Sequence, residues 1–264
     1  MNILEKIVAK KKTEVAASKI EQPVSVLEKS PLFSKPVLSL PEFLLNPEKS
    51  GIIAEFKKQS PSKGIINNSS FTGDVVKDYE KCGASAVSVL TDKEFFGGSL
   101  EDLKQASSVL NIPLLRKDFI IDEYQLIEAK AFGADIILLI AACLSKAEVR
   151  SLSTVAKDFG LNVLLEIHTE SELDHICDEV DVVGINNRDL KTFKVDLNHS
   201  VELAKKIPSQ KLKISESGID DVRTIEFLKN NGFSGFLMGE KFMKEENPGK
   251  AFGAFVDELK ELSK

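Results

Sequence analysis

Short apolar runs alternate with longer amphipathic stretches along the chain, beginning at Gly51. Most of these runs are continuously apolar instead of alternating with period two, which is typical of parallel strands covered on both faces. Eight runs are therefore predicted as strands: Ile52–Phe56, Ala86–Leu90, Pro113–Arg116, Asp135–Ile140, Asn162–Glu166, Asp181–Ile185, Lys211–Ser215 and Gly235–Met238.

The amphipathic stretches between these runs predict helices. Val75, Val76 and Tyr79 form one apolar stripe, and Ser145 with Glu148 three residues later forms a capping box. The joints "CGASAVSVL", "FGADIILLI" and "NGFSGFLMG" resemble one another weakly, as a repeated helix–strand unit would. Helices are expected within residues 71–84, 122–134, 145–160, 169–180, 197–207, 220–232 and 248–264.

Eight strand–helix units in 264 residues predict an α/β fold, a (β/α)8 TIM barrel. A doubly wound sheet would be expected to carry a GxGxxG turn after its first strand, and none is present there. We expect a single barrel domain over 1–264, with the barrel at 49–264 and an N-terminal extension at 1–48. The extension is predicted as an amphipathic helix at 3–18, followed by mostly extended chain or loop from Pro23 to Pro47, and it is not expected to be essential to the barrel core.

Composition narrows the class of protein. Hydrophobic residues make up 42% and charged residues 29%, and the net charge of −6 argues against a general nucleic-acid binder while leaving room for a small anion pocket. Three scattered cysteines without a CxxC pair indicate a reducing compartment, and three histidines without HxH or HExxH spacing argue against a metal. The N-terminus lacks an apolar signal segment, and the longest apolar run, Ile136–Leu144, is too short to span a membrane. We expect a cytoplasmic protein without membrane partners; its oligomeric state is open, with a monomer as the working expectation.

Charged side chains stand where the predicted strands end, which is where a (β/α)8 barrel carries its active site. A single such residue is most simply a solvated rim group. Several carboxylates and lysines converging on one rim would instead pair and shift one another's pKa values, as acid–base chemistry requires. The candidate catalytic residues are Glu55, Lys57, Lys117, Glu166, Asn186 and Glu216.

Gly218 and Gly239 follow the last two predicted strands and precede predicted helices. Loops at these positions form the common phosphate site of barrels, because backbone N–H groups there point at the anion. Ordinary turn glycines are the alternative. Ser60, in the loop after the first strand, would close over the same anion.

Seven stretches carry a resemblance to a known family. In chain order they are "IIAEFKKQSPSKG", "SVLTDKEFFGGS", "LLRKDFIID", "LLEIHTE", "GINNRDL", "ISESGI" and "FLMGEKFM". With these motifs, which cover residues from about 50 to 245, the sequence resembles the indole-3-glycerol phosphate synthase family of tryptophan biosynthesis. The segment "ILEKIVAKKKTEVA" resembles the family's extra helix, which packs over the catalytic mouth of the barrel.

The resemblance implies a reaction and a division of roles. The substrate would be 1-(2-carboxyphenylamino)-1-deoxyribulose 5-phosphate, converted to indole-3-glycerol phosphate, CO2 and water without a cofactor. By motif position, Lys117 resembles the general acid of ring closure and Glu166 the base of dehydration. Lys57 would pair with the substrate carboxylate and could also serve as an acid.

The remaining residues would support these three. Glu55, Asn186, Glu216 and Arg188 would hold hydroxyls and lysines; Ser217, Gly218, Gly239 and Ser60 would hold the phosphate; Phe96 and Phe119 with Leu138 or Leu139 would form the anthranilate pocket. Glu240 stands where some members carry Ser, so we expect its backbone N–H to bind phosphate and its side chain to point away.

Other functions stay open at this point. The isomerase of the neighbouring pathway step would be expected to place Cys and Asp where this chain has Glu55 and Asn186. A metal-dependent epimerase would need His and Asp at several strand ends, where only His168 is available. A catalytically silent phosphate-binding barrel is the alternative from another class, although burying so many charges costs stability unless they act.

Overall fold

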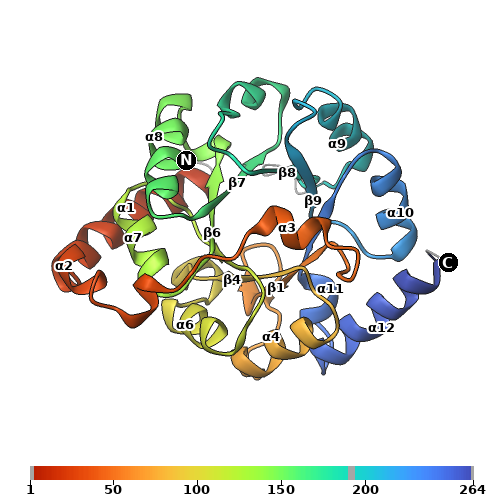
Figure 1. Cartoon of the computed structure of the whole chain (residues 1–264), viewed down its shortest axis with the longest axis horizontal. Helices are drawn as coiled ribbons and strands as arrows, with labels where there is room; N and C mark the ends of the chain where they lie inside the picture. The colour runs from red at the N-terminus through yellow and green to blue at the C-terminus, as the bar shows by residue number, and fades with distance from the viewer. Residues whose placement is uncertain (1–2, 190–193, 263–264) are drawn as a thin grey trace.

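The computed structural model describes residues 3–189 and 194–262 and contains a closed barrel of eight parallel strands (Figure 1). The predicted fold class is confirmed, and each predicted strand end lies within one residue of its observed position. In hydrogen-bonding order the strands are β1 (Ile52–Phe56), β10 (Gly235–Met238), β9 (Leu212–Glu216), β8 (Val182–Asn186), β7 (Asn162–Ile167), β6 (Ile136–Ile140), β5 (Leu114–Lys117) and β4 (Ala86–Leu90).

Both faces of the strands are buried, which explains the continuous apolar runs. Ile53 and Leu164 belong to the cluster inside the barrel, whereas Ile52 and Leu165 belong to the larger cluster between strands and helices. β1 closes the barrel by pairing in parallel with both β4 and β10.

The outer helices follow the predicted pattern in most places, and the short α5 and η2 were not predicted. The capping box at Ser145 is present, but α6, between β4 and β5, was not predicted, and residues 169–180 form only the short 3-10 helix η3. Described helices after β1 are α4 (Thr72–Lys81), α5 (Lys93–Phe96), α6 (Leu100–Val109), α7 (Tyr124–Ala131), η2 (Ala141–Cys143), α8 (Lys146–Asp158), η3 (Glu170–His175), α9 (Leu197–Ala204), α10 (Val222–Asn230), α11 (Glu240–Met243) and α12 (Pro248–Leu262).

The N-terminal extension is more helical than predicted. After α1 (Ile3–Glu21) it forms α2 (Val24–Leu27), η1 (Pro31–Ser34) and α3 (Leu40–Leu45). The expectation of mostly extended chain is wrong because Ser30 and Ser39 cap η1 and α3, and each helix carries a proline in its first turn. Proline is tolerated there, since the first-turn N–H groups have no intrahelical partner.

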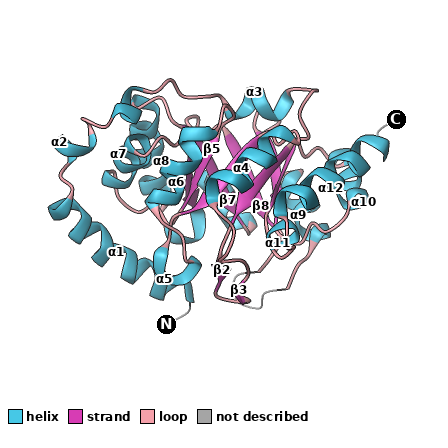
Figure 2. Ribbon diagram, turned by 90° about the horizontal axis from the view of Figure 1, so that it is seen from below, coloured by secondary structure: helices cyan, strands magenta, loops and turns pink. Residues whose placement is uncertain are grey.

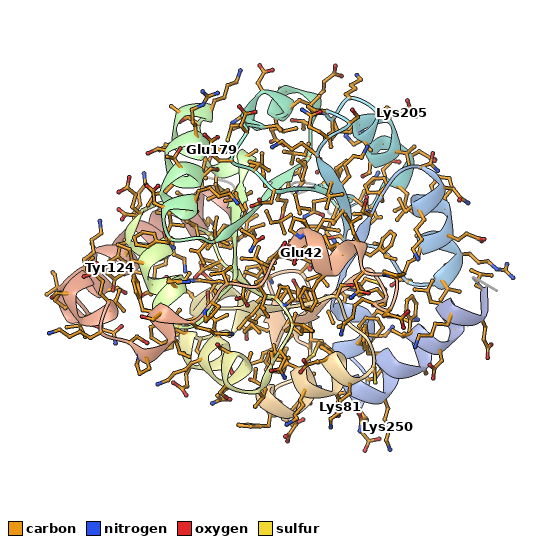
Figure 3. All side chains as sticks on the ribbon, in the orientation of Figure 1. Glu42, Lys81, Tyr124, Glu179, Lys205 and Lys250 are labelled. Carbon is orange, nitrogen blue, oxygen red and sulfur yellow. The ribbon has the colours of Figure 1, made fainter. Side chains whose placement is uncertain are left out.

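The helix α3 closes the amino-terminal end of the barrel, called the base below. Leu40 and Leu44 are buried in the same cluster as the interior residues of the strands. In Figure 1 the orange α3 crosses the centre of the barrel, and Figure 3 labels its exposed outer residue Glu42 near that centre. The extension therefore contributes Leu40 and Leu44 to the barrel core, while the expectation that the core can form without the extension stays a prediction.

The helix α1 lies toward the opposite end. Figure 2 shows α3 at the top of the molecule and the N-terminal end of α1 near the bottom. The hairpin of β2 (Gln59–Ser60) and β3 (Gly64–Ile65), which was not predicted, also lies toward the bottom of that view. Tyr124 of α7, labelled at the left of Figure 3, donates its hydroxyl to the carbonyls of Ser18 and Gln22 at 3.0 and 2.9 Å. None of the described helices is long and apolar enough to cross a bilayer.

Candidate active site

A cavity of about 430 Å³ opens at the carboxyl ends of the strands, the end called the mouth below. All eight strands contribute lining residues, and Ile3, Leu4 and Ile7 of α1 lie over it. The lining includes every residue that the sequence proposed: Glu55, Lys57, Ser60, Phe96, Lys117, Phe119, Leu138, Glu166, Asn186, Arg188, Glu216, Ser217, Gly218, Gly239 and Glu240.

Lys117 of β5 lies between two buried carboxylates inside this cavity. Its Nζ is 3.1 Å from Glu166 Oε2 of β7 and 3.0 Å from Glu216 Oε2 of β9. Asn186 Nδ2 donates to the other oxygen of Glu166 at 3.0 Å. Because four separate strands bring these groups together, the barrel itself fixes the geometry of the cluster.

The three groups shift one another's pKa values. Burial acts to lower the pKa of Lys117, but Glu216 and Glu166 raise it above its ordinary value, so the ammonium stays protonated. Burial raises the pKa of Glu216 to about 7 despite Lys117. For Glu166, burial also acts to raise the pKa, but Lys117, His168 and the hydrogen bond from Asn186 together lower it below its ordinary value. As the pH falls through neutrality, Glu216 is the member of the cluster that takes up a proton.

Two glycines provide the space for the buried carboxylates. A Cβ atom at Gly184 of β8 would lie 2.1 Å from Glu216 Oε1, and one at Gly239 would lie 2.7 Å from Glu55 Oε1. Sequence reasoning missed Gly184, although glycine inside a strand often marks a close approach. The sequence analysis assigned Gly239 only to phosphate binding, whereas the absence of a side chain at Gly239 also makes room for Glu55.

A second group of charges lies nearer the rim. Lys57 Nζ is 2.6 Å from Glu55 Oε1. Glu240 is among the lining residues, and its carboxylate lies 3.8 Å from Arg188 Nη2 and 3.5 Å from Lys63 Nζ. The expectation that its side chain points away from the phosphate stays a prediction.

The loop after β9 has a distinctive backbone. Ser217 and Gly218 both adopt left-handed conformations, with φ of 70° and 68°. Asn187, a buried residue that the sequence did not assign to the site, donates to the carbonyl of Ser217 at 2.7 Å. A side chain at Gly218 would collide with Val195, whose Cγ1 is 2.4 Å from the Cβ position. Glycine is therefore required at 218 by both backbone and space.

One wall of the cavity is apolar. The rings of Phe96 and Phe119 lie 6.1 Å apart with a tilt of 36°. Leu138 lines the cavity, whereas Leu139 packs in the core between strands and helices, which resolves the alternative between them. Ile7 extends this wall from α1.

His168 lies behind the cluster and not in the cavity lining. Its Nε2 is 3.4 Å from Glu166 Oε1, and neither ring nitrogen has a hydrogen-bond partner in the described part of the chain. Within residues 3–189 and 194–262, no group of three or more His, Cys, Asp or Glu side chains is arranged to hold a metal ion.

Comparisons with known proteins agree with the geometry. The family model described as indole-3-glycerol phosphate synthase matches residues 4–255. The chain belongs to the indole-3-glycerol phosphate synthase family. Curated proteins of this name from Bacteroides thetaiotaomicron and from Campylobacter jejuni subsp. doylei are each 44% identical to the chain. These alignments cover 97% and 96% of the chain, and 98% and 100% of the respective relatives.

Solved structures add support for the fold alone. A mutant tryptophan synthase α-subunit from Pyrococcus furiosus superposes on this indole-3-glycerol phosphate synthase family member with a TM-score of 0.62 at 14% identity. The superposition covers 81% of this chain and 99% of that one. A thiamine phosphate pyrophosphorylase from the same organism gives 0.59 at 13% identity, covering 82% and 99%. At such identity the likeness concerns the barrel only.

Proposed function

We propose that the cavity at the mouth closes the indole ring of 1-(2-carboxyphenylamino)-1-deoxyribulose 5-phosphate. As a member of its family the chain is a decarboxylating lyase of tryptophan biosynthesis, and the proposal assigns the work among its residues. The observation that carries it is the position of the Lys117 ammonium, 3.0 to 3.1 Å from two buried carboxylates of other strands.

Lys117 acts in ring closure. An aromatic carbon attacks the ketone of the sugar chain, and negative charge develops on the carbonyl oxygen. A protonated lysine at the floor of the cavity stabilises that charge and delivers the proton. Its raised pKa keeps the ammonium charged before the substrate binds. The fixed carboxylates orient it, so little reorganisation is needed in the transition state.

Decarboxylation and dehydration follow. Loss of CO2 returns the electron pair to the ring and restores its aromaticity, after Lys57 has held the departing carboxylate. Glu166, whose lowered pKa keeps it ionised, takes the proton that is lost in dehydration. The leaving hydroxyl receives a proton from a lysine and departs as water. Glu55, Asn186, Glu216 and Arg188 hold hydroxyls and lysines in position.

The two ends of the substrate occupy different parts of the cavity. The phosphate lies against the backbone N–H groups of 217, 218, 239 and 240, with Ser60 closing over it. The carboxyphenyl ring lies between Phe96, Phe119 and Leu138. The proposed partner is a phosphorylated small molecule, and the reaction uses no cofactor. We also propose that the protein is a cytoplasmic monomer. Its chain divides into an extension at 1–48 and a barrel at 49–264.

Indole fluorescence tests the proposal directly. The chain contains no tryptophan, so indole emission in the reaction mixture comes from product alone. Purified protein should convert the substrate to a fluorescent indole with release of one CO2 per turnover. Failure to form indole from this substrate, with the barrel folded by circular dichroism, would contradict the proposal.

A further inference from the structure

A buried lysine outside the catalytic cluster is paired with two carboxylates of the mouth. Lys11 of α1 is only 4% exposed, and its Nζ lies 2.9 Å from Asp92 Oδ2 and 3.0 Å from Asp118 Oδ1. Asp92 and Asp118 are 1% and 3% exposed. A third pair, to Glu14 on the same helix at 2.8 Å, is closer to solvent. Charges this deeply buried are tolerated only when paired, so the lysine and the two aspartates form one unit.

Asp118 links this unit to one aromatic ring of the cavity. It directly follows Lys117 and precedes Phe119. The same Oδ1 atom that faces Lys11 accepts a hydrogen bond from the backbone N–H of Phe119 at 2.8 Å. The ammonium of Lys11 therefore shares with Arg116, whose Nη2 lies 3.0 Å from Asp118 Oδ2, the neutralisation of the carboxylate that fixes the start of this segment.

Asp92 links the unit to the other ring. Its Oδ1 accepts a hydrogen bond from the N–H of Phe95 at 2.8 Å and so caps α5, the short helix that carries Phe96. In the described part of the chain Asp92 Oδ2 accepts no hydrogen bond. The ion pair with Lys11 is thus the interaction that compensates this buried oxygen.

The helix α1 supplies the third piece. Ile7 lines the cavity and stands four residues before Lys11, so both side chains lie on the same face of the helix. One ammonium thus connects the three segments that carry Ile7, Phe96 and Phe119.

We propose that Lys11 is a positioning residue that sets the aryl side of the cavity. It holds the two phenylalanine rings and α1 at the spacing that the carboxyphenyl ring of the substrate requires, and it takes no part in the phosphate side. The identity of the ring rests on the proposed function. Loss of the Lys11 ion pairs should therefore weaken binding of the carboxyphenyl half of the substrate and leave binding of the phosphate half unchanged.

Separate inhibitors for the aryl side and the phosphate side of the cavity distinguish this positioning role from a general loss of order in the site. Lys11→Met removes the charge while keeping a side chain of similar length. Lys19→Met is the matched control, because Lys19 also belongs to α1 but forms its ion pair, with Asp122, at a site more exposed to solvent. For both variants and wild type, kcat, KM and the inhibition constants of 2-aminobenzoate and inorganic phosphate are measured. We expect Lys11→Met to raise KM and the 2-aminobenzoate constant about tenfold, since small misplacements of a binding wall are costly. The phosphate constant should stay unchanged, and Lys19→Met should match wild type.

The remaining outcomes are also decisive. If Lys11→Met does not fold, Lys11→Met with Asp92→Asn carries the test, because Asn keeps the helix cap without an unpaired charge. An equal rise in both inhibition constants, or no rise in either, overturns the proposal, and so does failure of both variants to fold. Absence of indole formation by the wild type would be a failure of the proposed function. It is distinguishable from a failure of the Lys11 proposal, which appears in the inhibition constants of the variants.

Discussion

The base and the mouth of the barrel are formed by the same strands but differ in how their buried polar groups are satisfied. At the base, Asp135 accepts the N–H groups of Leu38 and Leu114 at 3.0 and 2.9 Å, and Asn162 bonds the segment that leads into α3. At the mouth, Glu216 Oε1 is buried without a hydrogen-bond donor among the described residues.

This difference separates stability from function. The base uses the polar atoms of Asp135 and Asn162 to hold the segment that carries Leu40 and Leu44, called the plug below. The mouth keeps charges in an arrangement that is only partly satisfied, which costs stability but preserves groups for a substrate. Changes at the two ends should therefore alter different measured quantities.

The largest effect is expected at the mouth from Lys117→Ala. Turnover should fall by about 10²–10⁴-fold, the usual range for general acid catalysis, while KM changes less. A general acid acts on charge that develops only in the transition state, so its loss appears in kcat. Steady-state indole fluorescence measures both constants. Near wild-type turnover with collapsed binding would make Lys117 a binding residue, and Lys57 would be the next acid to test.

At the base, Leu44→Ala should lower the free energy of unfolding by about 2–5 kcal/mol, because it leaves a cavity in the plug. kcat and KM should stay near wild type at temperatures where the variant is folded. Leu45→Ala is the matched control, since this neighbour is 61% exposed and should change stability by less than about 0.5 kcal/mol. Urea titrations measure the difference; equal destabilisation by both variants would argue against the plug.

A smaller effect is expected from Gly218→Val. The left-handed φ of 68° and the contact with Val195 would impose strain of about 1–3 kcal/mol and displace the loop that we propose binds the phosphate. KM should rise by about tenfold or more with a smaller change in kcat, because phosphate contacts are made in ground and transition states alike.

Gly160→Val provides the control for backbone strain. Gly160 has a φ of 74°, open space around its Cβ position and a location between α8 and β7, at the end of the barrel opposite the mouth. It should lose stability while keeping the KM of wild type. A matching rise in KM for both glycine variants would show that strain, and not the phosphate loop, is responsible.

The smallest effect concerns pH and Glu216. Its pKa of about 7 in the folded chain lies above the ordinary 4.5, so between these values the folded state binds more protons than the unfolded state. This contribution to stability is present below about pH 4.5 and is lost as the pH rises through 7. Glu216→Gln imitates the protonated group, so the unfolding free energy of the variant relative to wild type should increase over this window. A pH-independent difference in urea midpoints would contradict the assignment.

The strands and the mouth could be predicted because both leave local signals. Buried parallel strands produce continuous apolar runs, and charges that directly extend such runs, such as Glu166 and Glu216, indicate a strand-end site. The helices η1 and α3 were missed because prolines that start a short helix are indistinguishable in pattern from prolines in a loop.

Other features depend on contacts between distant segments. Lys11 stands between Lys10 and Lys12, so periodicity gives no reason to expect it to be buried. Gly184 matters because of Glu216 on the next strand, and Asn187 because of a carbonyl thirty residues later. Such pairings arise only when the barrel closes, and no local pattern encodes them.

The plug at the base has a consequence for how the chain folds during synthesis. Leu40 and Leu44 leave the ribosome before any barrel strand, yet their binding surface includes Ile214 of β9 and Leu237 of β10, near the C-terminus. A Cβ atom at Gly235 would lie 2.8 Å from Leu44, so the plug directly contacts the last strand to be made. Part of the binding surface of the plug is therefore missing until the last strands have been made. Until then the native contacts cover its apolar side chains only in part, which leaves surface that a chaperone specific for apolar segments could bind during translation.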